Sequence, residues 1–302
     1  MSQSDIPTDR EIDEGRRAFF GLGSAQAALT TIGAVAAAAA APLGSAAEAQ
    51  SLNANDTDIL NFALNLEYLE TEYYLRGVIG ITADEYFRAN LGGPVKGGRK
   101  VTFSTPVHDG LFRNITGNEV QHVNFLRSIN GAAAVQRPPI DFDAGFAGVA
   151  QAAGLPDFDP FANEMNFFLG AMLFEDVGVT AYKGSARNIR NKRILESAAG
   201  ILAAEGYHMG AVRSVIYKMG DEWRRRSVNI SDMRDRLDGP EDLDQPVVQI
   251  GDRSNVVPAN QNGIAYGRTP QHVLNIVYGN PAQGVLMGGF YPQGVNGRIR
   301  ST

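Results

Sequence analysis

The sequence predicts an all-α protein built on a four-helix bundle. Four long segments have the boundaries of helices, and each carries at least one glutamate on an otherwise apolar stripe. In addition, two of the four histidines follow a glutamate by three residues, in the pairs Glu119 with His122 and Glu205 with His208. Residues three apart share one face of a helix, so each pair presents a carboxylate and an imidazole in the same direction.

The four helical segments are marked by residues that begin and end helices. They are expected at 56–77, 109–130, 160–183 and 189–219. The glycines Gly77, Gly131, Gly184 and Gly220 stand at or just after their ends, where a left-handed conformation is often needed. Pro160 is expected in the first turn of the third helix, where its missing N–H costs nothing.

Long connections separate these helices. Residues 78–108 form a long insertion between helices 1 and 2, and residues 131–159 form a crossover between helices 2 and 3. Both are rich in glycine and proline, which favours loops. The bundle is therefore expected at 50–220. Residues 221–302 follow as a loop-rich C-terminal extension with one helix at 269–278, packed on the bundle.

Composition excludes several kinds of chemistry. The chain has 302 residues, of which 44% are hydrophobic and none is cysteine. Disulfides, iron–sulfur clusters and thiol catalysis are thereby excluded, and any metal must be held by carboxylates and imidazoles. Residues 1–49 carry six acids and three bases, so half of the net charge of −6 belongs to them. The remaining chain is nearly balanced and gives no reason to expect nucleic acid as a partner.

The first 49 residues have the order of features found in an export signal. Arg16 and Arg17 precede a run without charge up to Glu48, and the small-residue pattern "AEA" closes it at 47–49. This segment resembles a twin-arginine export signal, cleaved before Gln50, which implies the twin-arginine machinery as a partner and a periplasmic or cell-envelope location. The alternative is a retained membrane-spanning helix, because the run is long enough to cross a bilayer.

Helical phase places the carboxylates inside the bundle. In the second and fourth helices, every other member of the stripe that holds the Glu–His pair is apolar. The third helix has Glu175 alone on its stripe, and the first has Glu67 and Glu70. A buried carboxylate without a positive partner is costly, so four such helices need cations between them.

Six residues match the ligands of a di-metal site. One glutamate from each of two helices combines with Glu-x-x-His from each of the other two. The candidate ligands are Glu67, Glu119, His122, Glu175, Glu205 and His208. Glu119 and Glu205 are expected to bridge the ions, and the other four to bind terminally. This donor set suits two Fe or two Mn ions. The alternative is that His122 and His208 are core histidines hydrogen-bonded to a helix neighbour.

These ligand motifs resemble the ferritin-like di-metal carboxylate superfamily. The stretches "LNFALNLEYLETEYYL" at 60–75 and "GGFYPQGVNG" at 288–297 are similar, more narrowly, to exported bacterial ferritin-like proteins related to plant desiccation-related proteins. The resemblance implies a ferritin-like bundle with Tyr74 beside the centre as a catalytic hydrogen-bond donor. It favours Glu67 as the ligand of the first helix, although Glu70 is a second inward acid that would replace or supplement it.

The resemblance implies redox chemistry on peroxide or oxygen. A catalase-like reaction in stress protection is favoured because it needs no external reductant, and a chain without cysteine has no rubredoxin module to supply electrons. Two other classes of function stay open. One is iron sequestration with ferroxidase activity, and the other is a non-catalytic envelope or stress-protective scaffold in which the metals only stabilise the bundle. A homo-oligomer is also open, although the long insertion and extension speak against a ferritin-like cage.

Overall fold

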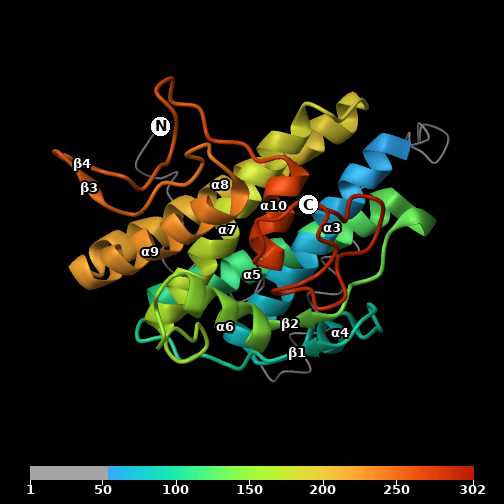
Figure 1. The fold of residues 1–302 in the computed structure, drawn as a ribbon. Coiled ribbons are helices and arrows are strands. Elements are labelled where there is room, and N and C mark those ends of the chain that lie inside the picture. The colour runs from blue at the N-terminus through green and yellow to red at the C-terminus, as the bar shows by residue number, and fades with distance from the viewer. Residues whose placement is uncertain (1–53) are drawn as a thin grey trace, which may run out of the picture. The chain divides into compact units, whose positions relative to one another are not determined.

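Four long helices form the bundle that the sequence predicts. The computed structural model describes residues 54–302, whose elements are labelled as in Figure 1. The bundle consists of α3 (Ala54–Tyr74), α5 (Pro106–Asn130), α7 (Glu164–Ala186) and α8 (Lys192–Lys218). The all-α prediction is thus confirmed, and the few strands are two residues long.

Side-chain caps set where these helices begin. The hydroxyl of Thr105 accepts from the His108 amide, and Pro106 follows at the first helical position, so α5 begins earlier than expected. The side chain of Asn163 caps α7 by accepting from the Asn166 amide. The expectation that Pro160 lies in the first turn of the third helix is therefore wrong, because this cap fixes the start four residues later, at Glu164.

The bundle is made of two antiparallel pairs, α3 with α5 and α7 with α8. Asn61, early in α3, accepts a hydrogen bond from Asn130 at the end of α5, 3.0 Å away. The two pairs meet through α3 and α7, where the ring of Tyr73 stacks on Phe167 with centroids 4.5 Å apart. Aromatic and aliphatic side chains fill the space between them and leave the polar centre enclosed.

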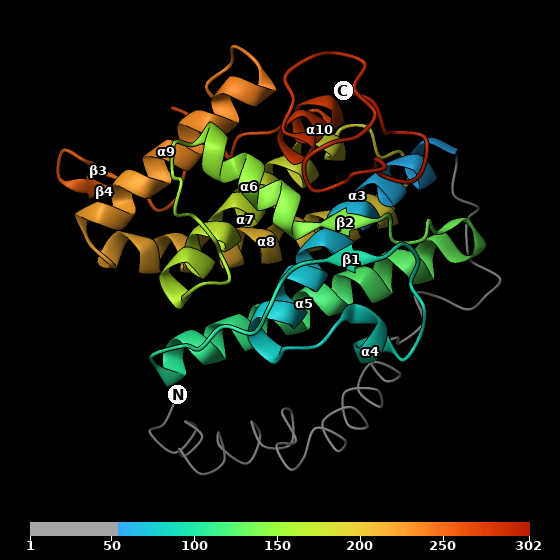
Figure 2. The same ribbon diagram turned by 60° about the horizontal axis from the view of Figure 1, so that its bottom comes forward.

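The insertion and the crossover contain short elements of their own. The π-helical turn η2 (Leu75–Ile79) continues α3 into the insertion, which holds α4 (Ala83–Phe87) and β1 (Val95–Lys96). The crossover holds η3 (Gly131–Ala133), β2 (Ile140–Asp141) and α6 (Phe142–Ala152). Strand β1 pairs in parallel with β2, with Val95 opposite Ile140. The buried guanidinium of Arg137 joins the segments, because it contacts Glu72 of α3 and Asp84 of α4. Figure 2 shows the insertion running along α3 and α5.

Helix α6 corrects the expectation of a continuous loop at 131–159. The carboxylate of Asp141 caps the helix by accepting from the Ala144 amide. One face then buries Phe142 and Phe146, which pack against each other and against Phe290. Two glycines within the segment obscured this pattern in the sequence, and burial of the aromatic face outweighs their low helix propensity.

The C-terminal extension is also more helical than expected. It contains α9 (Asp221–Asp238), β3 (Gln249–Ile250), β4 (Arg253–Ser254) and α10 (Pro270–Tyr278). Strands β3 and β4 pair antiparallel, with Gln249 opposite Ser254. Helix α10 lies where a helix was expected, whereas α9 replaces an expected loop. Helix α8 ends at Lys218 with Met219 as its C-cap, and Gly220, with a φ of 102°, is already the N-cap of α9. The chain starts α9 at once because Ile230 and Met233 bury its inner face.

A buried network of ion pairs fastens this extension to the bundle. It joins six side chains whose charges alternate in sign: Arg213, Asp176, Arg234, Asp244, Arg268 and Asp238. Asp176 lies on α7 and receives hydrogen bonds from Arg213 of α8 and Arg234 of α9, at 2.8 and 2.9 Å. Helix α9 contacts α7 and α8, and α10 contacts α7 and α9 (Figure 1).

The export signal expected at 1–49 lies outside the described residues. Within residues 54–302, none of the helices combines the length and the apolar composition that crossing a bilayer requires.

Candidate metal centre

The six predicted ligands converge at the middle of the bundle, although they span 142 positions of sequence. All are buried: the four glutamates are inaccessible, and His122 and His208 are 8% and 4% exposed. Their ligand atoms form two groups, each within 4.8 Å. The first comprises Glu67, Glu119, His122 and Glu205, and the second comprises Glu119, Glu175, Glu205 and His208. Glu119 and Glu205 belong to both groups, which is the arrangement that bridging carboxylates need.

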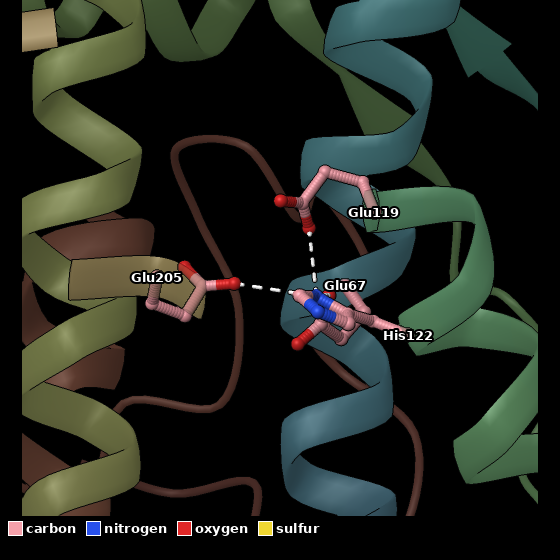
Figure 3. A group of neighbouring side chains, drawn as sticks. All are labelled: Glu67, Glu119, His122 and Glu205. Carbon is pink, nitrogen blue, oxygen red and sulfur yellow. Dashed lines mark hydrogen bonds and ion pairs between the residues drawn. The ribbon is translucent and has the colours of Figure 1, made fainter. Parts of the chain in front are cut away.

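The first group surrounds Nδ1 of His122 (Figure 3). Oε2 of Glu67 lies 3.2 Å from this nitrogen, Oε2 of Glu119 lies 3.4 Å away, and Oε1 of Glu205 lies 3.3 Å away. These side chains come from α3, α5 and α8, so three helices supply one position. Three carboxylate oxygens and an imidazole nitrogen facing one point are a donor set for a divalent cation.

The second group surrounds Nδ1 of His208. Oε1 of Glu119 lies 3.0 Å from this nitrogen, and Oε2 of Glu175 lies 3.3 Å away. Glu119 therefore directs Oε2 to the first group and Oε1 to the second. The two imidazole rings lie 6.2 Å apart between centroids, with their planes inclined by 30°.

Most of the inward-facing atoms lack hydrogen bonds; the exceptions are Nδ1 of His122 and Oε2 of Glu67, which lie 3.2 Å apart. Both oxygens of Glu119, both oxygens of Glu205, Oε2 of Glu175 and Nδ1 of His208 are buried without a hydrogen-bond partner among the described residues. Leaving one buried polar group unsatisfied costs about 1–3 kcal/mol, and a charged one costs more. Six such atoms at one place fit a metal centre, because metal ions would bond to the oxygens and neutralise the acids.

The pKa values also show that the polypeptide alone does not stabilise four ionised carboxylates at this place. Burial raises the pKa of Glu67 to about 7, although His122 acts in the opposite direction. Burial and then repulsion from Glu119 raise the pKa of Glu205 well above its usual range. Burial acts to lower the pKa of His208, but Glu175 and Glu119 outweigh it and raise this pKa to about 11. The carboxylates thus retain protons that metal ions would displace.

Glu119 behaves differently from the other carboxylates. Burial acts to raise its pKa, but the imidazoles of His122 and His208 outweigh this effect and lower it. Glu119 lies between the two rings and contacts both, at 3.4 and 3.0 Å. It is therefore the carboxylate that keeps its charge most readily.

A tyrosine hydroxyl donates a hydrogen bond to the outer oxygen of Glu175 and of Glu67. Tyr74 of α3 donates to Oε1 of Glu175 on α7, so this predicted residue does lie beside the centre. In return, Tyr182 of α7 donates to Oε1 of Glu67 on α3, at 2.5 Å. Tyr182 was not predicted, although a signal exists: it follows Glu175 by seven residues, as Tyr74 follows Glu67.

Glu70 lies outside both ligand groups. It is 5% exposed, and no described residue forms a hydrogen bond or ion pair with it. It lines a cavity of about 20 Å³ between α3, α7 and α10, which has room for about one water molecule. Burial and then repulsion from Glu205 raise the pKa of Glu70 well above its usual range. The geometry therefore makes Glu67, and not Glu70, the α3 member of the cluster.

The insertion covers one end of the bundle. Phe103 packs against Phe112 and Phe167, beside the ring of Tyr74. Within the centre, the side chains of His122 and His208 retain 10% and 5% exposure, whereas the four carboxylates retain at most 1%. The two imidazoles are therefore the members of the centre that lie nearest to solvent.

Comparison with known proteins agrees with this geometry. Residues 55–218 match the family model described as a ferritin-like domain. The chain is 30% identical over 266 residues to the ferritin-like catalase Nec2 of Nesocodon mauritianus, an alignment that covers 81% of this chain and 84% of the relative. It is 28% identical over 248 residues to the desiccation-related protein PCC13-62 of Craterostigma plantagineum, covering 75% and 79%. The chain therefore belongs to the ferritin-like domain family.

Proposed function

We propose that the chain holds two iron or two manganese ions in the buried cluster and uses them for redox chemistry on peroxide or oxygen. The observation that carries this proposal is the sharing of Glu119 and Glu205 between two groups of ligand atoms. Glu67 and His122 complete the first position, and Glu175 and His208 complete the second. When bound, such ions supply electrons reversibly, because both metals cycle between the +2 and +3 states.

The favoured reaction is a catalase-like disproportionation of hydrogen peroxide. One peroxide loses two electrons and two protons and becomes O₂, and a second peroxide takes up the same electrons and protons and becomes two waters. The reaction balances without a further reductant, which suits a chain that has no cysteine. The name of the Nesocodon relative, a ferritin-like catalase, supports this choice.

The residues around the ligands hold and shield the reacting groups. Tyr74 and Tyr182 fix the outer oxygens of Glu175 and Glu67, so that the inner oxygens stay directed at the centre. Burial excludes bulk water and larger reductants, whereas the slight exposure of the imidazoles admits a molecule as small as peroxide. The same enclosure strengthens every electrostatic interaction within the site.

The test is metal analysis followed by activity assays on the full chain. We expect about two iron or manganese ions per chain and release of oxygen from peroxide, measured with an oxygen electrode. Glu196→Ala on the exposed face of α8 serves as the control and should match the wild type. Consumption of ferrous iron with oxygen, together with negligible peroxide turnover, would favour a ferroxidase. Bound metal without either reaction would favour a structural role.

We also propose that the chain is exported by the twin-arginine route and acts in the periplasm or cell envelope as a stress-protective protein. The order of Arg16, Arg17, the uncharged run and the "AEA" pattern supports export. The name of the Craterostigma relative, a desiccation-related protein, supports the role in stress. Mass spectrometry of exported protein should find a mature N-terminus at Gln50, and replacing both arginines with lysine should trap the precursor. Intact precursor in a membrane fraction would contradict cleavage.

A further inference from the structure

The two halves of the centre correspond residue by residue. Glu67 with Tyr74 on α3 matches Glu175 with Tyr182 on α7, and each tyrosine bonds the glutamate of the opposite helix. Likewise, the Glu-x-x-His pair of α5 matches that of α8. The halves differ at the outer nitrogens of the two imidazoles.

The outer nitrogen of His208 has a partner. Nε2 of His208 lies 3.0 Å from Oδ1 of Asn118, a half-buried residue on α5. An amide oxygen only accepts hydrogen bonds, so Nε2 of His208 carries the proton and donates. Nδ1 faces Glu119 and Glu175, which lie 3.0 and 3.3 Å away, and is the nitrogen that a metal ion would bind.

The outer nitrogen of His122 has no such partner. Asn118 directly precedes Glu119, and the equivalent position before Glu205 is Ala204, whose methyl group accepts no hydrogen bond. No side chain or backbone group in the described part of the chain forms a hydrogen bond with Nε2 of His122. The polar contacts of this ring within that part are all made by Nδ1. Its side chain is also twice as exposed as that of His208, at 10% against 5%.

We propose that the two metal positions are unequal and fill in order, the Glu175/His208 position first, and that Asn118 is the positioning residue that sets this order. The inference rests on the proposed two-metal centre. A hydrogen bond to the outer nitrogen fixes the orientation and tautomer of a ligating imidazole and raises its basicity, and its loss typically costs about 10–100-fold in metal affinity. The His122 position, without this bond and nearer to solvent, exchanges its ion more readily.

The experiment is a titration of the metal-free full chain with Mn²⁺, in which free Mn²⁺ is followed by electron paramagnetic resonance. The wild type should bind in two steps whose dissociation constants differ by at least about tenfold. Asn118→Ala should weaken the tighter step by about 10–100-fold and merge the two. Asn118→Asp, which keeps an acceptor at this place, should restore two steps. Asn114→Ala, an exposed asparagine on the same helix, is the matched control and should bind like the wild type.

Variants that lack one of the two histidines show which metal position Asn118 affects. With His122→Ala, the remaining tight ion should be weakened when Asn118→Ala is added. With His208→Ala, the remaining weak ion should be indifferent to the same addition. Equal effects in both backgrounds, or no effect in either, would overturn the inference while leaving the two-metal centre in place. A wild type that binds neither Mn²⁺ nor Fe²⁺ would instead overturn the proposed function.

Discussion

The hydroxyl of Tyr182 donates to Oε1 of Glu67 across the bundle, at 2.5 Å. Tyr182 lies on α7 and Glu67 on α3, so this bond joins the two antiparallel helix pairs. Burial, followed by repulsion from Glu67, raises the pKa of Tyr182 well above its usual range, so the hydroxyl keeps its proton and can donate. Tyr74 and Glu175 form the reciprocal bond. The two terminal carboxylates are therefore oriented by residues from the opposite helix pair.

Tyr182→Phe should destabilise the metal-loaded protein by about 1–3 kcal/mol, because Oε1 of Glu67 is left buried without a donor. Chemical denaturation of the loaded protein measures this change. Tyr207→Phe is the matched control, since Tyr207 is 78% exposed on α8. Equal unfolding free energies for both variants would show that the Tyr182 bond does not support the centre.

Gly178→Ala should displace a bridging carboxylate. A Cβ at this position of α7 would lie 2.5 Å from Oε2 of Glu205 and 3.4 Å from Oε1 of Glu70. We expect bound metal to fall below two ions per chain, as measured by elemental analysis. Gly200→Ala on α8 is the control, because a Cβ there meets no atom within 4 Å. It should retain the metal and gain up to about 1 kcal/mol in stability from helix propensity. Full metal content in Gly178→Ala would contradict the placement of Glu205.

The stabilising effect of metal should grow as pH rises from 5 to 7. In the metal-free chain, the folded pKa of Glu67 is raised from 4.5 to about 7, so this residue contributes stability below pH 4.5 that is lost as pH rises to 7. The raised pKa of Glu205 acts in the same direction. Metal binding strengthens over the same range because fewer protons compete for the ligands.

Thermal unfolding with and without chelator, at pH 5, 6 and 7, measures this prediction. The difference in Tm between the two samples should widen at each step. The lowered pKa of Glu119 acts in the opposite direction, but its contribution is lost only as pH falls below 4.5, outside this window. A difference that narrows with rising pH would contradict the account of the buried carboxylates.

Arg268→Ala should release the C-terminal extension from α7. The Arg268 guanidinium bonds Asp238 at 2.6 Å and the Thr180 hydroxyl at 2.8 Å, and it also pairs with Asp244. Removing one partner of a buried ion pair costs about 3–5 kcal/mol, because the opposite charge stays buried. Denaturant unfolding measures the loss. Arg113→Ala, in a half-exposed pair with Asp109, should change stability little.

The convergence of the six buried side chains could be predicted from sequence because its signals are local. Glu119 and His122 lie on an apolar helical stripe. A charge on such a stripe requires a partner, regardless of the conformation of the connecting loops. Asn118 could not be assigned in the same way, since its role depends on how α5 and α8 face each other. Tyr182 lies between these cases: its spacing from Glu175 was visible, but its partner Glu67 is 115 residues away.

The connections were predicted less well, because tertiary packing overrides their composition. Helix α6 contains two glycines and was expected as loop, yet its aromatic face packs on Phe290 from the far end of the chain. Helix α9 follows Gly220 directly and has a strongly polar composition. It is held to the bundle by its buried inner face and by Arg234, whose buried guanidinium reaches Asp176 of α7. Neither contact is visible in a local window of sequence.

We propose that Glu119 and Glu205 bridge two metal positions, whereas Glu67 serves one. The most direct test is the metal content of the full chain after reconstitution with Fe²⁺ or Mn²⁺, measured by elemental analysis. We predict about two ions per chain for the wild type and for Glu196→Ala. Glu67→Ala should retain about one ion, and Glu119→Ala and Glu205→Ala should weaken both positions and abolish turnover. A wild type that takes up neither metal and melts at the same temperature with or without chelator would contradict the claim.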